Sequence, residues 1–320
     1  MLYSLLKIPA RIALPFHCRE ICINNKSYLK SEGPLLLACN HPNSFLDAVI
    51  LATLFNKPVY SLARGDAFNK KWGAFLLKQL NILPVYRERE GTEHLHKNYH
   101  TFDACIEIFK QNGIVLIFSE ALCENEWHLR PLKKGTARLA VAAWQQNIPL
   151  KILPIAVNYS SFHLFGKNIH LNFGDCIEKP AVMPENENAK LLTDITSNVQ
   201  QQLQQLVYEI DKDDTIKQAE IFTIHFTKAK KILLALPAAV GMLLYWPLYI
   251  PVEKLVSTKA FHSVHYDSIM VGMLFVLYPL YVLLLCLFTY FLEGGYWWIA
   301  TLLLAPFCAW SYVQLKKQTN

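Results

Sequence analysis

The chain has 320 residues, of which 53% are hydrophobic and 18% are charged, and its formal net charge is +6. It is too long for one small domain, and its positive mean hydropathy is atypical of a wholly soluble protein. No basic cluster has the density that nucleic-acid binding requires, whereas a positive net charge suits a protein that lies against an anionic leaflet. We therefore expect membrane lipids as partners and no nucleic acid; the oligomeric state stays open.

Residues 1–30 begin with an apolar stretch, Met1 to Phe16, that Lys7 and Arg11 interrupt. The stretch lacks the basic start, the long apolar core and the cleavage site of a signal peptide. Its apolar side chains and two cations suit a short helix at the membrane interface, and a helix packed on the following domain is an equal alternative. We treat residues 1–30 as an interfacial N-terminal region.

Residues 31–215 alternate strand-like apolar runs with helical patterns, which is typical of an α/β sheet. The expected strands are residues 34–39, 58–63, 82–86, 114–119, 152–158 and 169–174. The expected helices are residues 45–55, 69–80, 94–112, 133–146 and a glutamine-rich stretch at 191–210. In open sheets of this type, ligands bind at the carboxyl ends of the strands. We expect a mostly parallel sheet flanked by helices, with its site at that edge.

The segment Asn40 to Asp47 follows the first expected strand and reads Asn-His-Pro-Asn-Ser-Phe-Leu-Asp. If Pro42 and Asn43 turn the chain, the imidazole of His41 can meet the carboxylate of Asp47. Neutral imidazole is a good base near neutral pH, and a carboxylate bonded to its other nitrogen fixes the tautomer. The pattern predicts a catalytic base with its orienting carboxylate. The alternative is a loop histidine beside an aspartate that favours the helix dipole.

Three further blocks follow in order along the chain. They are Asn81-Ile82-Leu83-Pro84-Val85-Tyr86-Arg87, then Phe118-Ser119-Glu120 followed by Pro131-Leu132-Lys133-Lys134-Gly135, and finally Ile152-Leu153-Pro154-Ile155-Ala156-Val157. With the histidine segment, these blocks resemble the signatures of the glycerolipid acyltransferase family, which comprises glycerol-3-phosphate and lysophosphatidic acid acyltransferases. The resemblance covers residues 30–180 and implies this family's fold and reaction class.

The chain departs from the common family pattern at specific positions. Five residues separate His41 from Asp47, where the family usually has four, and this spacing resembles a subgroup with a longer His-Pro-Asn motif. Asn81 stands where glycine is usual, and Ser119 and Ala121 stand where proline and glycine are usual. Despite these differences we still expect the family's reaction class, but they do not determine which acceptor the protein uses.

Candidate substrate-binding residues lie in the same blocks. Arg87 follows a short strand and offers a bidentate fork for a phosphate, and the resemblance also assigns this arginine to the acceptor. Glu120 closes an apolar strand, where a carboxylate is costly unless it is bonded. We expect it to hold the acceptor hydroxyl or to organise the turn of Lys133, Lys134 and Gly135. The alternative for Arg87 and both lysines is a solvated charge.

Two further interpretations concern single residues near these blocks. Arg64 follows the second expected strand and is a candidate for the same cleft, with a simple turn as the alternative. Ser44 lies three residues after His41, and we interpret it as the cap of the following helix and not as a nucleophile. Direct acyl transfer is therefore favoured over an acyl-enzyme.

The eight cysteines do not predict disulfides, because those in apolar patterns of a cytosolic domain stay reduced. His17, Cys18 and Cys22 have the spacing of metal ligands on a helix, but no fourth ligand completes a usual zinc pattern. We expect no metal and no bound cofactor; acyl-CoA or acyl carrier protein would be a substrate.

Residues 216–320 form the expected membrane region. Residues 232–252, 268–292 and 294–315 are each uncharged for at least 21 residues, enough for a helix to cross a hydrocarbon core of about 30 Å. The first segment holds three prolines, which favours a kinked or re-entrant helix. Lysines before the first segment and after the last one place both flanks in the cytosol. We expect two spans plus a re-entrant or interfacial segment.

These observations predict a membrane-bound O-acyltransferase of phospholipid biosynthesis. It would move a fatty acyl chain from acyl-CoA or acyl carrier protein to glycerol 3-phosphate or lysophosphatidic acid. The expected location is a bacterial inner membrane, with the catalytic domain on the cytoplasmic side. One alternative is an acyltransferase for an amino-acid lipid or another acceptor without a phosphate. A second is a non-enzymatic membrane scaffold, although the apolar segments hold almost no ionisable residue of the kind that a transport path needs.

Overall fold

A seven-stranded sheet forms the centre of the computed structural model, which describes residues 2–86, 92–181 and 188–319. The strand order is β1-β7-β6-β2-β5-β3-β4. The strands are β1 (Cys18–Ile23), β2 (Leu35–Cys39), β3 (Val59–Arg64), β4 (Ile82–Val85), β5 (Ile114–Phe118), β6 (Lys151–Tyr159) and β7 (Lys167–Phe173). Neighbouring strands are parallel apart from β6 and β7, which are antiparallel. The predicted fold class, a mostly parallel sheet, is confirmed.

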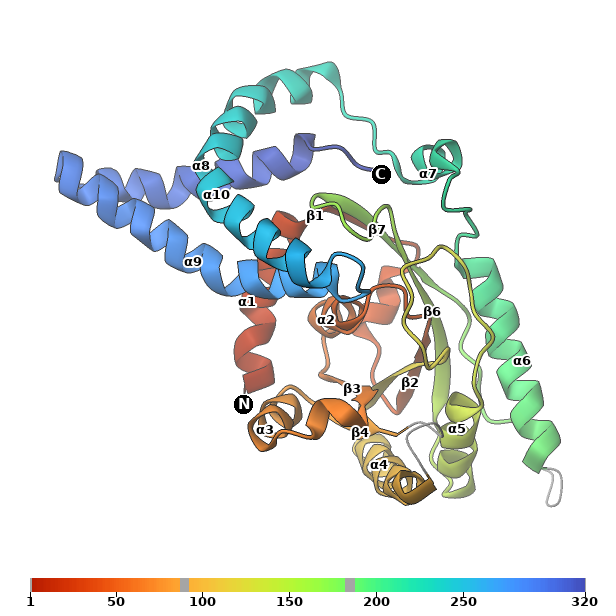
Figure 1. Ribbon diagram of the computed structural model, residues 1–320. Helices are drawn as coiled ribbons and strands as arrows, with labels where there is room; N and C mark the ends of the chain where they lie inside the picture. Colours follow the sequence, from red (N-terminus) through yellow and green to blue (C-terminus); the bar gives the residue numbers. More distant parts are fainter. Residues whose placement is uncertain (1, 87–91, 182–187, 320) are drawn as a thin grey trace.

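Helices pack on both faces of this sheet (Figure 1). The elements that flank it are α1 (Leu2–His17), η1 (Lys26–Lys30), α2 (Phe45–Leu54), η2 (Gly65–Phe68), α3 (Lys71–Gln79), α4 (Thr92–Lys110), α5 (Gly135–Gln145), α6 (Asn188–Leu206) and α7 (Thr215–Phe222). Successive residues of a strand point to opposite faces. Leu37 of β2 therefore packs in the core beside α2, and Leu36 packs in the core formed with α4, α5 and α6. Burial on both faces explains why β2 is continuously apolar.

The N-terminal region contains a strand that its sequence did not predict. β1 pairs in parallel with β7 at the edge of the sheet, directly after α1. Cys18 and Cys22 therefore lie on a strand and lack the helical spacing that suggested metal ligands. In the part of the chain that the structure describes, no group of three or more His, Cys, Asp or Glu residues has the arrangement to hold a metal ion.

The helix α1 packs on the sheet domain through one face and exposes apolar side chains on another. Tyr3 is buried and donates a hydrogen bond to the carbonyl of Ala52 at 3.0 Å, so one face packs on α2. On the other side, Leu5, Ile8 and Ile12 are each more than 60% exposed. This apolar face is available to a membrane interface.

Three C-terminal helices, α8 (Lys228–Ala260), α9 (Tyr266–Glu293) and α10 (Trp297–Leu315), are long and apolar enough to cross a membrane. α8 holds three prolines and curves above the sheet domain, whereas α9 and α10 extend away from it side by side (Figure 1). α8 also packs closely on α10 at Gly241, where a Cβ atom would lie 2.2 Å from the carbonyl oxygen of Cys308. Glycine permits this approach because it has no Cβ.

Both ends of α8 are attached to the sheet domain. Just before α8, the backbone N–H of Ile224 donates to Oε1 of Gln318 at 2.7 Å, and Asn168 of β7 donates to the same oxygen. Just after α8, the ring of Phe261 stacks on His163 with a centroid separation of 5.5 Å. The chain therefore leaves the domain and returns to it within α8, whereas the α9–α10 hairpin projects outward (Figure 1).

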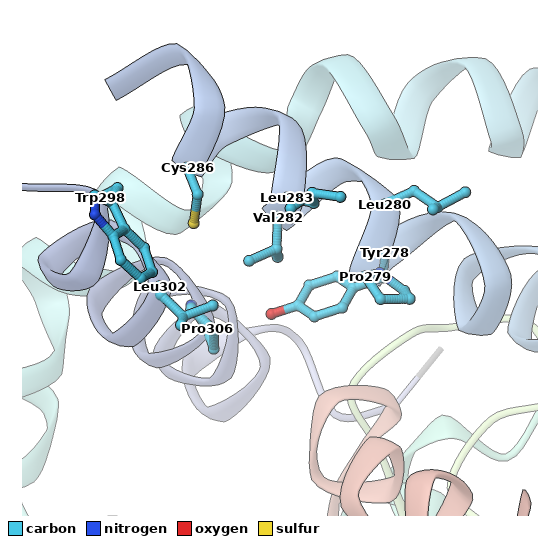
Figure 2. A pocket seen from close by; sticks show the side chains of 9 residues that line it. All are labelled: Tyr278, Pro279, Leu280, Val282, Leu283, Cys286, Trp298, Leu302 and Pro306. Atoms are coloured by element: carbon cyan, nitrogen blue, oxygen red, sulfur yellow. The ribbon is translucent and has the colours of Figure 1, made fainter. Parts of the chain in front are cut away.

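A cavity of about 560 Å³ lies between α9 and α10. Figure 2 shows the hydroxyl of Tyr278, the sulfur of Cys286 and the indole nitrogen of Trp298 among apolar side chains. The lining residues are Tyr278, Pro279, Leu280, Val282, Leu283, Cys286, Trp298, Leu302 and Pro306. None of the site residues predicted from the sequence is among them. The candidate site lies elsewhere, at the sheet edge.

Candidate active site

His41 and Asp47 meet across the turn that joins β2 to α2. His41 Nδ1 lies 2.9 Å from Asp47 Oδ2. The side chain of Asp47 is fully buried, whereas that of His41 keeps 18% of its surface exposed. The turn of five intervening residues therefore closes as the sequence predicts. It leaves the imidazole accessible to a substrate and shields the carboxylate from water.

Two further groups hold Asp47. The hydroxyl of Tyr159 donates to Asp47 Oδ1 at 2.7 Å, and the backbone N–H of Asn43 donates to Asp47 Oδ2 at 2.9 Å. Burial raises the pKa of Tyr159 well above its usual value, and the charge of Asp47 adds to this effect. Tyr159 therefore stays protonated and remains a donor. Sequence reasoning missed it, although it ends β6 at the same sheet edge as the end of β2.

The ring of His41 is also fixed by stacking. It lies on the ring of Phe118 with a centroid separation of 3.7 Å and an interplanar angle of 13°. Phe118 ends β5 and is the register partner of Cys39 at the end of β2, so parallel pairing brings the two rings together. Because Nδ1 is hydrogen-bonded to Asp47, Nε2 is the ring nitrogen that can accept a proton from a substrate.

Glu120 lies at the same edge, two residues beyond β5, and is 6% exposed. Burial raises its pKa to about 8, and the nearby charge of Asp47 acts in the same direction. Hydrogen bonds from the backbone N–H groups of Arg130 and His41 partly oppose this rise. Glu120 is therefore largely protonated at neutral pH and contacts the backbone of the proposed base.

The turn of Lys133, Lys134 and Gly135 connects to this edge through its backbone. The N–H of Lys133 donates to the carbonyl of Ser119 at 2.8 Å, and both lysine side chains are exposed. Nζ of Lys134 donates to Thr193 of α6 at 3.1 Å and thus points to α6 in this structure. A Cβ at Gly135 would make only ordinary contact at 3.6 Å, so packing alone does not require this glycine.

Arg64 ends β3 at the same sheet edge, and its exposed guanidinium pairs with Asp66. Burial lowers the pKa of His265, and the positive charge of Arg64 lowers it further. Arg64 therefore lies within electrostatic reach of the site. Arg87, predicted to bind the acceptor phosphate, is outside the described residues.

The start of α9 also reaches the site, which sequence reasoning missed. Ser44 precedes α2, but its side chain makes no capping bond, so the predicted capping role is wrong. Instead, Ser44 Oγ lies 2.5 Å from His265 Nδ1. Asp267 accepts a hydrogen bond from the side chain of Asn43 at 2.7 Å. The sequence did offer one signal for this contact. Asp267 is an ionisable residue beside an apolar segment, where such residues are rare.

An apolar cavity of about 240 Å³ adjoins the turn. It is lined by residues of α1, α2 and α9, with side chains from β3 and β4 at one side. Leu46 and Ser268, which are hydrogen-bonded to each other beside the His41–Asp47 pair, belong to this lining. The site therefore combines an accessible imidazole with an adjacent apolar chamber.

Comparison with known proteins gives one family model and one solved structure similar to this chain. A family model described as Acyltransferase matches residues 20–158. The crystal structure of the 1-acyl-sn-glycerophosphate (LPA) acyltransferase PlsC from Thermotoga maritima matches with a TM-score of 0.41 and 13% identity, over 62% of this chain and 79% of that chain. No curated protein matches the chain significantly. The segment that matches this family model, residues 20–158, contains both His41 and Asp47.

Proposed function

We propose that the protein is a membrane-bound O-acyltransferase of phospholipid biosynthesis. It transfers a fatty acyl chain from acyl-CoA or acyl carrier protein to glycerol 3-phosphate or lysophosphatidic acid. The observation that carries the proposal is the 2.9 Å contact between the accessible His41 and the buried Asp47, inside the segment that matches the acyltransferase model.

In the proposed reaction, Nε2 of His41 takes the proton of the acceptor hydroxyl as its oxygen attacks the thioester carbonyl carbon. The carbon–sulfur bond then breaks, and the thiol leaves with the proton returned from His41. Asp47 stabilises the imidazolium that forms between these steps, and Phe118 keeps the ring in place. Direct transfer fits the 6% exposure of Ser44, since a nucleophile must reach the carbonyl.

The apolar cavity beside the turn supports a fatty acyl donor. Leu6 and Leu14 of α1, Val49 of α2, and Val271 and Phe275 of α9 contribute to its lining. Burying each methylene of an acyl chain in such a chamber stabilises the complex by about 0.8 kcal/mol. We propose that the acyl chain lies there, with its thioester next to His41.

For the acceptor, we propose a set of basic groups around the sheet edge. Arg64 and Arg87 would bind the phosphate in bidentate fashion, and Lys133, Lys134 and the backbone at Gly135 would add positive charge and N–H donors. Because Lys134 contacts Thr193 in this structure, its side chain would have to swing toward the acceptor. Protonated Glu120 would orient the acceptor hydroxyl.

We further propose that α9 and α10 cross the membrane and that α8 lies along its surface or re-enters it. The proposal divides the chain into three parts: an interfacial region (residues 1–30), the acyltransferase domain (residues 31–215) and the membrane region (residues 216–320). Attachment of both ends of α8 to the domain supports two crossings. The lysines that flank the membrane region favour a cytoplasmic domain, and we assign the membrane as a bacterial inner membrane.

The test measures transfer of a radiolabelled acyl chain by purified protein from acyl-CoA and from acyl carrier protein. Glycerol 3-phosphate, lysophosphatidic acid and an amine lipid are offered separately. We expect His41→Ala to lower transfer to a phosphate-bearing acceptor by about 10²-fold or more. His128→Ala is the matched control, because that imidazole is exposed and pairs with Glu209. Full activity of His41→Ala would overturn the proposal. If the wild-type protein transfers the acyl chain to the amine lipid alone, the proposed phosphate-bearing acceptor is wrong.

A further inference from the structure

The first turn of α9 contacts the turn that carries the proposed base and its carboxylate. The three contacts join Ser44 to His265, Leu46 to Ser268, and Asn43 to Asp267. The partners are more than 220 residues apart in the chain. A helix suited to cross the membrane thus begins inside the candidate site.

Asn43 is the central residue of this contact. It is fully buried, and its backbone N–H donates to Asp47 Oδ2 at 2.9 Å while its side-chain amide donates to Asp267 Oδ2 at 2.7 Å. The hydroxyl of Ser268 donates to the Asn43 carbonyl at 3.3 Å. One residue therefore links the carboxylate that orients His41 to a second carboxylate on α9.

Asp267 is itself held by buried groups from other elements. It is 2% exposed and pairs with Lys167 of β7, which is fully buried. Nε2 of His17, at the end of α1, lies 3.8 Å from Asp267 Oδ1, and burial lowers the pKa of His17 to about 4, so this imidazole is neutral. A buried carboxylate is costly without a partner, and the Lys167 ammonium offsets that cost. Asp267 is thus a fixed acceptor for Asn43, held by its buried ion pair with Lys167.

The backbone of the turn also needs outside support. Ser44 has φ 52° and ψ −136°, a conformation that residues other than glycine rarely adopt. Such a conformation persists where the surrounding structure imposes it. Here the surroundings are His265, at 2.5 Å from the Ser44 hydroxyl, and Cys123, whose sulfur accepts from the Ser44 N–H at 3.0 Å.

We propose that Asp267 is a positioning residue for acyl transfer. Through Asn43 it keeps Asp47, and hence the imidazole of His41, in the orientation that receives the acceptor proton. The inference rests on the proposed function, because it assigns Asp267 a role in that reaction. It also means that the α9–α10 hairpin completes the active site, with a residue that lies beyond the segment 20–158 matched by the family model.

The first test variant is Asn43→Ala, which removes the amide between the two carboxylates and leaves the Lys167–Asp267 pair intact. We expect kcat to fall about 10- to 100-fold while KM for donor and acceptor stays within about twofold, because orientation and not binding is lost. Thr289→Ala is the matched control. It removes a hydroxyl bonded only within α9 and to Thr301, near the outer end of the hairpin, and should keep wild-type kcat.

The second variant addresses Asp267 directly. Asp267→Leu removes the acceptor of the Asn43 amide, which an asparagine would retain. Because Asp267→Leu alone leaves a buried ammonium unpaired, it is combined with Lys167→Met to preserve folding. We expect this pair of substitutions to lower kcat as Asn43→Ala does. Adding Asn43→Ala to it should lower kcat by less than the product of the separate effects, since all act through one link.

A readout independent of activity separates this inference from the proposed function. The histidine ring signals in ¹H–¹⁵N spectra are assigned by the signal lost in His41→Ala, and the Nδ1 proton bound to Asp47 should shift in Asn43→Ala but not in Thr289→Ala. Wild-type kcat in Asn43→Ala, or an unchanged His41 signal, would overturn the positioning role. Wild-type protein that is inactive with every donor, but shows the shift, would overturn the proposed function alone.

Discussion

Arg19, in the first strand, donates a hydrogen bond from Nε to the backbone carbonyl of Gln314 at the end of the last helix, at 2.8 Å. The same guanidinium also donates to the carbonyls of Val313 and Lys316. A helix leaves its last carbonyls without partners, and a buried cation satisfies them and complements the negative end of the helix dipole. The membrane hairpin therefore returns to the domain at a defined place.

This return predicts the membrane topology. In a background without native cysteines, single cysteines at His262, Tyr296 and Thr319 report the loop after α8, the tip of the hairpin and the C-terminus. We expect an impermeant thiol reagent to label positions 262 and 319 from the side of the catalytic domain and position 296 from the opposite side. Labelling of position 262 from the same side as position 296 would show that α8 crosses the membrane.

Arg19→Ala should destabilise the protein. The substitution leaves buried carbonyls of α10 without donors, and hydrogen bonds to a charged group contribute about 1.5–3 kcal/mol. We expect the free energy of unfolding to fall by about 2 kcal/mol, measured by thermal unfolding in detergent. Arg138→Ala, at an exposed position of α5, is the control and should change stability little. Equal stability of the two variants would contradict this role of Arg19.

Glu120 predicts how stability depends on pH. Burial raises its pKa from 4.5 to about 8 in the folded state. Between these values the folded protein holds a proton that the unfolded chain releases, so this group's contribution to stability decreases as pH rises from about 4.5 to about 8 and then levels off. Glu120→Gln should flatten the decrease, as seen in melting temperatures across this range. The same slope in Glu120→Gln as in wild type would contradict the prediction.

Local patterns predicted most of the sheet, and long-range contacts explain what they missed. The apolar run of β2 and the helical spacing after Phe45 sufficed for the turn that joins His41 to Asp47. β1 was missed because Arg19 and Glu20 interrupt its apolar pattern. The role of Ser44 was misjudged because its partner, His265, is 221 residues away. The spacing of a short polar motif predicts contacts within the motif, but it does not predict which distant element packs against it.

Tyr159→Phe tests how far the hydrogen bond to Asp47 contributes to the reaction. The change removes one oxygen and keeps the ring, so the buried Asp47 Oδ1 loses its donor at 2.7 Å while the packing around it persists. Because Asn43 still holds Oδ2, His41 keeps its partner but the carboxylate is less firmly oriented. We expect kcat to fall about tenfold, by analogy with the groups that orient metal ligands, whose loss costs about 10–100-fold. Phe162→Leu, a nearby core change without a polar atom, controls for repacking and should affect stability more than kcat. If Tyr159→Phe keeps wild-type kcat, Asn43 alone is enough to orient Asp47, and Tyr159 is only a partner that satisfies a buried charge.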